Sequence, residues 1–360
     1  QAAVVSVFPP EDVGAARMQV ALTLVPPALE PCGPLPVSPA ATSTILKTCS
    51  GPELLSLAQY CATALPHARR PADLLGMSLV LFTASHVSLN ATAFDKVLSW
   101  SLVLLEALKS GVLGHLIDGC VPNIDDEKPL WSWTDDVPHA EGLRQLCLRT
   151  TFMIAVSQAM LGDFPLAVGR LHAAMDGDPV PIMSMSEMCD TFFLTADLSV
   201  PTVGEDLVIS TTQRGLALLK DLGVDVDLDQ SDDVVAQLFV DTIGKMMDIV
   251  ENGTLTTAPP VCETPDRVPV AIMIKLASVL WTRMKLRLKA MMSVRMVELA
   301  IRNGGRWLCG NVFALFAVSE CPFTGLLPPV EIYKYAWEVL LPDCPADHSD
   351  PILNGVSAVI

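Results

Sequence analysis

Proline is distributed so unevenly along this chain that it separates a short non-helical segment from a long helical one. Eight prolines fall within the first 39 residues, at positions 9, 10, 26, 27, 31, 34, 36 and 39. Each fixes one backbone dihedral, removes a hydrogen-bond donor and disfavours helix at the preceding residue. Residues 1–45 are therefore expected to form an extended arm, which either runs over a neighbouring copy or packs on its own domain.

From residue 51 the apolar residues recur at helical spacing almost without interruption. Segment 51–65, GPELLSLAQYCATAL, has a proline and an acid in its first turn, and segment 91–111 ends on Lys109 and Gly111, as helices commonly do. Strand signals are few outside the arm, and no repeat of fixed period occurs. The sequence predicts a mainly α fold, with further helices at 140–161, 165–175, 204–222, 231–252, 270–303 and 329–341.

Two acidic, turn-rich connections interrupt this helical pattern, at residues 122–138 and 221–233. A chain of 360 residues is too long for one small core, so two lobes, or one large helical domain with extensions, are expected. The second connection is the more plausible boundary between them. The predicted organisation is an N-terminal arm (1–45), an N-terminal helical lobe (46–230), a C-terminal helical lobe (231–342) and a short C-terminal tail (343–360).

The two most apolar stretches, residues 74–89 and 268–282, favour core helices over membrane spans. The first contains His86 and the second contains Lys275, so neither supplies the ~20 clean apolar residues that a span requires. The ten cysteines form no CxxC pair, which argues against a structural zinc site, and most lie in apolar contexts typical of buried free thiols. In a chain of this length such thiols indicate a reducing compartment.

The acidic run Asp225, Asp227 and Asp229 has the spacing of a calcium loop but lacks the residues that complete one. Gln230 stands where glycine is needed, and Ala236 stands where a bidentate glutamate is needed. We therefore expect no metal at this loop, and predict that Ser231 caps the following helix with acids in its first turn. No other metal or cofactor motif is present.

Positive charge is concentrated in one stretch of an otherwise acidic chain. Residues 267–306 hold nine Lys or Arg and one acid, whereas the remainder holds fourteen and thirty-nine, and the formal net charge is −17. At about 100° per residue the arginines follow one arc of a helix, with Lys285 and Lys289 on another side. Arginine suits phosphate recognition better than lysine does. The segment predicts a groove for a single nucleic-acid strand, although neutralisation of the protein's own acids explains the same residues.

The candidate RNA-binding residues come mainly from this stretch, with supplements elsewhere. Arg144 and Arg149 on a predicted helix, and Lys334 beside two tyrosines, could extend a basic surface. No nucleophile elbow, zinc-protease, P-loop or dinucleotide-binding pattern occurs, so we expect a protein that is not an enzyme. The full predicted set is Lys275, Arg283, Lys285, Arg287, Lys289, Arg295, Arg302, Arg306, Arg144, Arg149 and Lys334.

An all-helical chain with a proline-rich arm and the basic stretch 283–306, followed by NVFALFAVSECPFTGLLPPVEIYKYAW, resembles nucleoproteins of nonsegmented negative-strand RNA viruses, of the bornavirus or mymonavirus kind. The resemblance is one of architecture. It implies two lobes that clamp single-stranded RNA by its backbone and terminal arms that dock on adjacent protomers to build a filament. It also implies a location in the virion and in the cytoplasm or nucleus of the host cell.

Two alternatives remain open from the residues alone. A helical viral capsid shell protein would use arms and broad apolar contacts without a continuous basic groove. A cytosolic helical scaffold or adaptor would need neither RNA nor a closed shell. The acidity of the N-terminal lobe, whose cleft side should be basic in a nucleoprotein, favours these alternatives.

Overall fold

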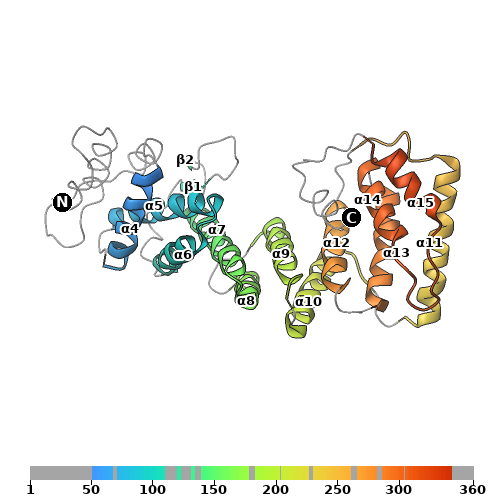
Figure 1. Cartoon of the computed structure of the whole chain (residues 1–360), viewed down its shortest axis with the longest axis horizontal. Helices are drawn as coiled ribbons and strands as arrows, with labels where there is room; N and C mark the ends of the chain where they lie inside the picture. Colours follow the sequence, from blue (N-terminus) through green and yellow to red (C-terminus); the bar gives the residue numbers. More distant parts are fainter. Residues whose placement is uncertain are drawn as a thin grey trace. The chain divides into compact units, whose positions relative to one another are not determined.

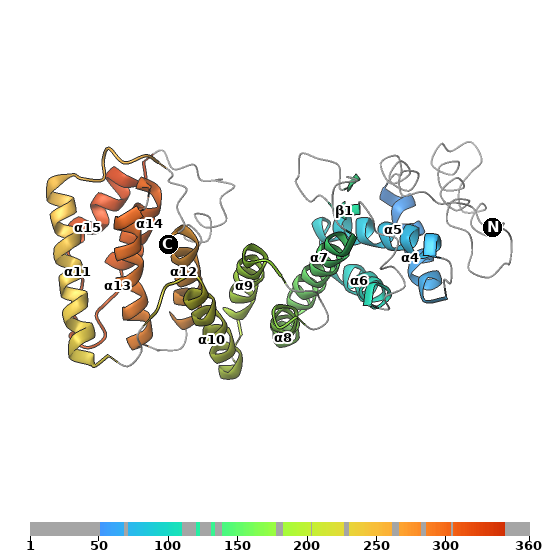
Figure 2. The ribbon, with the colours of Figure 1, turned by 180° about the vertical axis from the view of Figure 1, so that it is seen from behind.

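The computed structural model describes most of the helical part of the chain. The described residues are 51–67, 71–109, 120–122, 131–133, 139–177, 183–202, 204–226, 230–260, 266–281, 286–303 and 305–342. The predicted arm and tail lie outside them. The chain is mainly helical, as the sequence predicted, and divides into two compact units, residues 1–183 and 184–360 (Figures 1 and 2).

Unit 1 is a set of helices packed largely in chain order. Its elements are α4 (Gly51–Ala64), a 3-10 turn (Leu65–His67), α5 (Pro71–Asn90), α6 (Phe94–Lys109), β1 (Cys120–Pro122), β2 (Trp131–Trp133), α7 (His139–Met160) and α8 (Phe164–Met175). Each helix packs against the next, from α4 on α5 to α7 on α8 (Figure 1). Residues 76–85 of α5 are buried on every side, as expected of a core helix.

The two short strands are the only β-structure in the described part of unit 1. Val121 lies opposite Ser132 in an antiparallel pair, within the connection that the sequence marked as acidic and turn-rich. This pairing places Trp131 and Trp133 on a three-residue strand. β1 also packs against α7, so the connection is tied back to the unit to which it belongs.

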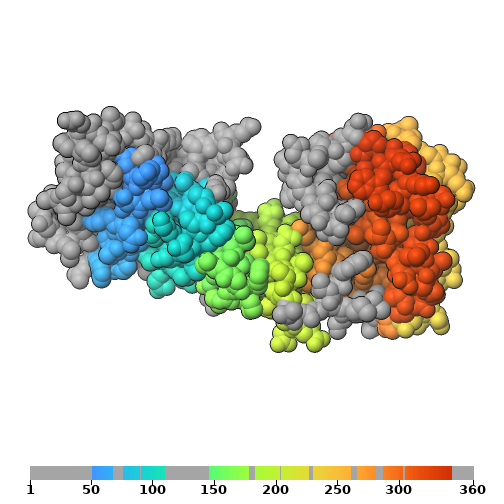
Figure 3. Space-filling view, in the orientation of Figure 1, coloured from blue at the N-terminus to red at the C-terminus, as the bar shows by residue number. Residues whose placement is uncertain are grey.

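The described residues of unit 2 form seven further α-helices and one π-helical turn. They are α9 (Met185–Ser199), α10 (Glu205–Asp221), α11 (Asp232–Asn252), α12 (Arg267–Trp281), α13 (Leu286–Asn303), α14 (Arg306–Ala317), α15 (Val330–Tyr335) and the π turn Ala336–Leu340. α12 packs against α9, α10 and α13, while α13 also packs against α11 and α14. In the space-filling view, the helices near the C-terminus form much of the coloured surface of this unit, with α11 at its edge (Figure 3).

The boundary between the units lies after Met183 and not at the acidic connection near residue 230. The reason is that α9 and α10 pack on α12, so the helices that the sequence assigned to the first lobe belong to the second. Gly215 of α10 permits this packing. A Cβ added there would lie 2.7 Å from Leu276 of α12 and 2.8 Å from Phe192 of α9.

The long helix expected over 270–303 is present as two helices, α12 and α13, which pack against each other. The helix expected over 231–252 begins as predicted. The Ser231 side chain accepts a hydrogen bond from the Val234 amide at 3.4 Å, and Asp232 and Asp233 occupy the first turn. This acidic first turn becomes important below.

The start of α14 is capped by backbone that lies far from it in sequence. The amides of Arg306 and Trp307 donate to the carbonyl oxygens of Pro259 and Pro260, at 2.8 and 3.1 Å. The first amides of a helix have no partner within the helix, so these two carbonyls satisfy donors that would otherwise need water or a ligand. The beginning of α14 is therefore not a free anion-binding site.

The close approach at Gly215 yields a prediction about stability. Gly215→Ala is expected to lower the unfolding temperature, since its Cβ would overlap two fully buried side chains and overpacking typically costs about 1–3 kcal/mol. Gly244→Ala in α11 is the matched control, because a Cβ there meets nothing within 4 Å. That control is expected to stabilise by roughly 0.5–1 kcal/mol through helix propensity. Calorimetry on both variants checks the pair, and equal effects would contradict the packing described.

Candidate nucleic-acid interface

The described cations of the basic stretch lie on α12, α13 and the first turn of α14, and most of them contact acids of unit 2. Arg287 is at the start of α13, next to the first turn of α11. Its Nε donates to Asp232 Oδ1 at 2.9 Å, and its Nη2 donates to the same oxygen. Both side chains are about half exposed. The acid that begins α11 is thus the partner of the first arginine of α13.

Farther along α13, Arg295 takes part in a second contact on the side facing α11. Its Nη1 donates to Glu298 Oε2 at 2.8 Å, and Lys245 of α11 lies 3.9 Å from the other oxygen of that carboxylate. Glu298, the single acid of the basic stretch, is therefore shared between two cations from neighbouring helices. Together with Arg287 and Asp232, these charges line the contact between α11 and α13.

Arg302, in the last turn of α13, makes its contact at the opposite end of the helix. Its Nη2 and Nε donate to Asp266 Oδ2 at 2.8 and 3.3 Å, and Asp266 immediately precedes α12. The guanidinium is 60% exposed while the carboxylate is 19% exposed. Fifteen residues of helix, roughly 22 Å, separate Arg287 from Arg302. Three arginines of the predicted arc are thus paired with acids on α11, on α13 itself and just before α12.

Lys275 is the most buried of these paired cations. It lies in the middle of α12, where the residues on both sides are buried, and its side chain is 15% exposed. Its Nζ donates to Asp197 Oδ1 of α9 at 2.6 Å. Because a lysine in an apolar helix must bring its charge to a partner, this pair fixes where α9 packs on α12.

Lys289 and Arg306 are half-buried, so neither side chain is fully accessible to a phosphate. Burial lowers the pKa of Lys289, so its charged form is held less firmly than in water. The Nε of Arg306 is buried without a hydrogen-bond partner among the described residues. Arg306 also occupies the first position of α14, where the positive end of the helix dipole disfavours a cation.

The remaining predicted residues are spread over both units. Arg283 and Lys285 lie outside the described residues, as does the side chain of Arg144 on α7. Arg149 is half-buried on α7 of unit 1, and Lys334 is exposed on α15 of unit 2. Within unit 2, the structure brings Arg287 and Arg295 to one helix contact and places Arg302, Lys275 and Lys334 elsewhere. Their acidic partners were missed at the sequence level, although an aspartate opening α11 was a visible signal.

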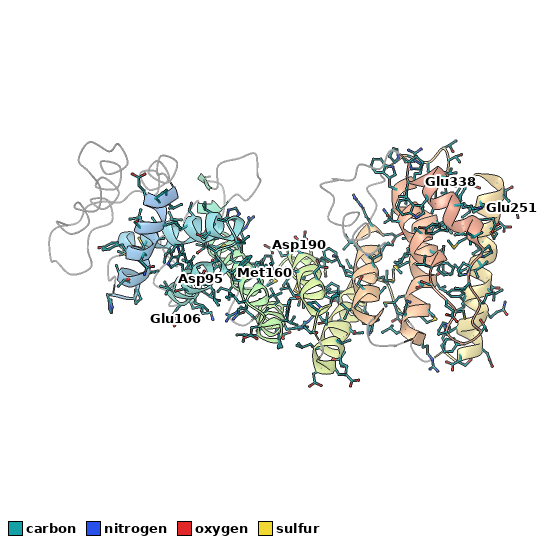
Figure 4. All side chains as sticks on the ribbon, viewed as in Figure 1. Asp95, Glu106, Met160, Asp190, Glu251 and Glu338 are labelled. Atoms are coloured by element: carbon teal, nitrogen blue, oxygen red, sulfur yellow. The ribbon has the colours of Figure 1, made fainter. Side chains whose placement is uncertain are left out.

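About half of the exposed large apolar side chains of the described residues fall in two short stretches of the chain. Met160, Leu161 and Leu166 are each about half exposed or more, at the corner where α7 meets α8 (Figure 4). The second group follows α14 in unit 2 and comprises Val318, Leu326, Leu327, Val330 and Trp337. Large exposed apolar groupings on a folded protein typically mark places where another molecule binds.

The described thiols are buried inside the two units. Cys61, Cys147, Cys189, Cys309 and Cys321 are free and buried. Burial raises the pKa of Cys147 to about 11 and that of Cys309 to about 12, so neither is a thiolate near neutral pH. Within the described residues no group of three or more His, Cys, Asp or Glu could hold a metal ion. Among the described helices, none combines the length and apolar character needed to cross a membrane.

Comparisons with protein-family models, with curated proteins and with solved structures gave no match. The likeness to viral nucleoproteins therefore rests on the sequence features given above.

The buried position of Lys275 yields a second prediction. Asp197→Asn is expected to cost about 1–3 kcal/mol of stability, because it leaves an ammonium that is 15% exposed without its carboxylate. Arg287→Gln, which breaks a half-exposed pair, is expected to cost at most about 1 kcal/mol. Adding Lys275→Met to Asp197→Asn should recover part of the loss. Chemical denaturation of the three proteins checks the order, and an equal cost for the first two would contradict it.

Proposed function

We propose that this chain is a non-catalytic helical subunit that assembles with copies of itself into a protein shell or scaffold. The observation that carries the proposal is the contrast between its charged and apolar groups. Lys275, Arg287, Arg295 and Arg302 are engaged with carboxylates of the same unit. The apolar groups at the α7–α8 corner and after α14 are exposed instead. The surface that remains available for another molecule is therefore apolar and acidic more than it is basic.

Two separate apolar groupings on one chain suit an assembly better than they suit a single dimer. A two-fold contact at one grouping closes after two copies, but the second grouping on each copy then remains free to bind further copies, so that rings, shells or filaments form. Apolar burial also supplies the stabilisation, at about 25 cal/mol per Å² removed from water. The acidic exterior, with a net charge of −17, keeps the free subunits soluble through mutual repulsion.

The direct test is the size and content of the purified full-length chain. Light scattering and electron microscopy are expected to show rings, closed shells or filaments, with an ultraviolet spectrum typical of protein alone. Added salt should favour assembly, since it screens repulsion between acidic subunits. A chain that stays monomeric at all concentrations and salt levels would exclude the proposal.

The second candidate is the RNA-binding nucleoprotein that the sequence predicted. One observation favours it: both members of the Arg287–Asp232 pair are about half exposed, the Arg302 side chain is 60% exposed, and exposed pairs hold together by only about 0–1 kcal/mol. A phosphate can therefore replace the carboxylate at small cost. In this case RNA would follow α13, and Lys245, 60% exposed, would add a third contact from α11.

Salt dependence separates the two candidates. If about six phosphates are neutralised per protomer, affinity for a single-stranded RNA oligonucleotide should fall with a log–log slope of about −4. Arg302→Gln should reduce that slope by about 0.7, whereas Lys96→Gln on α6 serves as the control with no expected change. Fluorescence anisotropy provides the measurement. Absence of binding at low salt would exclude the RNA-binding function and leave the shell or scaffold as the proposed function.

A further inference from the structure

The exposed apolar group after α14 forms a ridge with a defined shape. Leu326 and Leu327 precede α15, Val330 and Tyr333 lie three residues apart on α15, and Trp337 lies on the π turn that follows it. Leu327 is 60% exposed, Val330 56% and Trp337 44%. These five residues are called the C-terminal ridge here. Apolar residues spaced in this way on a helix are typical of an edge that packs against another element.

The ridge is held in place by its own backbone and rings. The Cys321 amide donates to the Leu326 carbonyl at 2.9 Å, and the Gly325 amide donates back to the Cys321 carbonyl at 2.9 Å. Gly325 adopts a left-handed φ of 67°, which closes this loop without strain. At the other end, the Tyr333 and Trp337 rings lie against each other, with centroids 6.2 Å apart. The exposed leucines are thus presented on a fixed support.

Three charged side chains border the ridge. Glu331, Lys334 and Glu338 are all exposed, with Glu331 about one turn before Lys334 and Glu338 about one turn after it. Figure 4 labels Glu338 at this end of unit 2. No described residue makes an ion pair with any of these three within 4 Å, unlike the paired cations of α12 and α13. The ridge therefore carries both signs of charge beside its apolar side chains, each open to an external partner.

We propose that the C-terminal ridge is the contact by which two copies of this chain pair about a two-fold axis. The copies would lie antiparallel, with Glu331 of each opposite Lys334 of the other. In a two-fold contact every interaction occurs twice, so a surface must complement itself. An acid and a base three residues apart on one helix meet this condition, because reversing the helix exchanges their positions.

The same register accounts for the apolar residues. Pairing Glu331 with Lys334 places Val330 and Tyr333 near the axis. In the same register, Trp337 of each copy lies just beyond the start of the other copy's α15, close to Leu327 of that copy. Protein–protein interfaces commonly have a buried tryptophan packed against apolar residues at the centre, with charged residues around the rim. The two acids per copy disfavour RNA or an anionic membrane surface as the occupant.

This inference rests on the proposed self-assembly, to which it adds the identity of one contact. The test is sedimentation of the full chain and of two charge variants, Glu331→Lys and Lys334→Glu. Each variant alone brings like charges together twice across the axis, and its dimer should dissociate at least about tenfold more readily than that of the parent. An equimolar mixture of the two variants restores opposite charges at both positions, so the mixed dimer should form with close to the parent's affinity.

Two controls separate this contact from other effects. Leu327→Ser should weaken pairing, whereas Leu102→Ser, an exposed leucine on α6 at 40% exposure, should leave it unchanged. Circular dichroism verifies that all variants are folded. The proposed contact is overturned if the charge variants form oligomers as readily as the unmodified chain, or if the mixture associates no more tightly than either variant alone. Either result leaves the assembly proposal standing. A parent chain that is monomeric throughout overturns both.

Discussion

Burial of α12 on all sides is the constraint on which the second unit depends. From Val270 to Leu280 nearly every side chain of this helix is buried, so α9, α10 and α13 must all cover it. Gly215 gives α10 the close approach it needs. Lys275, the one cation in the middle of the helix, is tolerated because Asp197 meets it from α9. An apolar helix with a single charge therefore determines both which helices surround it and how one of them is oriented.

The basic stretch illustrates how one set of residues can serve two purposes. In a chain with far more acids than bases, cations gathered on one helix attract the protein's own carboxylates from neighbouring helices. Asp232, Asp266 and Glu298 are supplied by α11, by the residue before α12 and by α13 itself. The contacts join these elements while leaving several guanidinium groups partly in water. The same arginines can thus hold neighbouring helices together and bind a phosphate. The two roles differ in whether the solvent-facing edge of each guanidinium contacts water or a phosphate oxygen.

Local patterns predicted most of the fold because they depend on neighbours in sequence. Ser231 began a helix where expected, and proline and glycine marked the helix limits well. The compact units divide after Met183 and not near residue 230, because α9 and α10 pack on α12 through contacts between residues that are distant in sequence. For the candidate site, the cations were visible but their partners were not. Nothing in the sequence relates Asp197 to Lys275, or Asp266 to Arg302, until the helices are placed.

The capping of α14 by Pro259 and Pro260 has a consequence for the order in which the chain acquires its structure. A helix whose first amides are satisfied only by a remote segment gains little from nucleating by itself. Residues 260 and 306 must first be brought together, and closing such a loop costs entropy that later contacts return. We therefore expect α14, and with it α15, to form after α11 and α13 have packed together. The exposed apolar side chains of the C-terminal ridge would then take up their positions only after the core of the unit has formed.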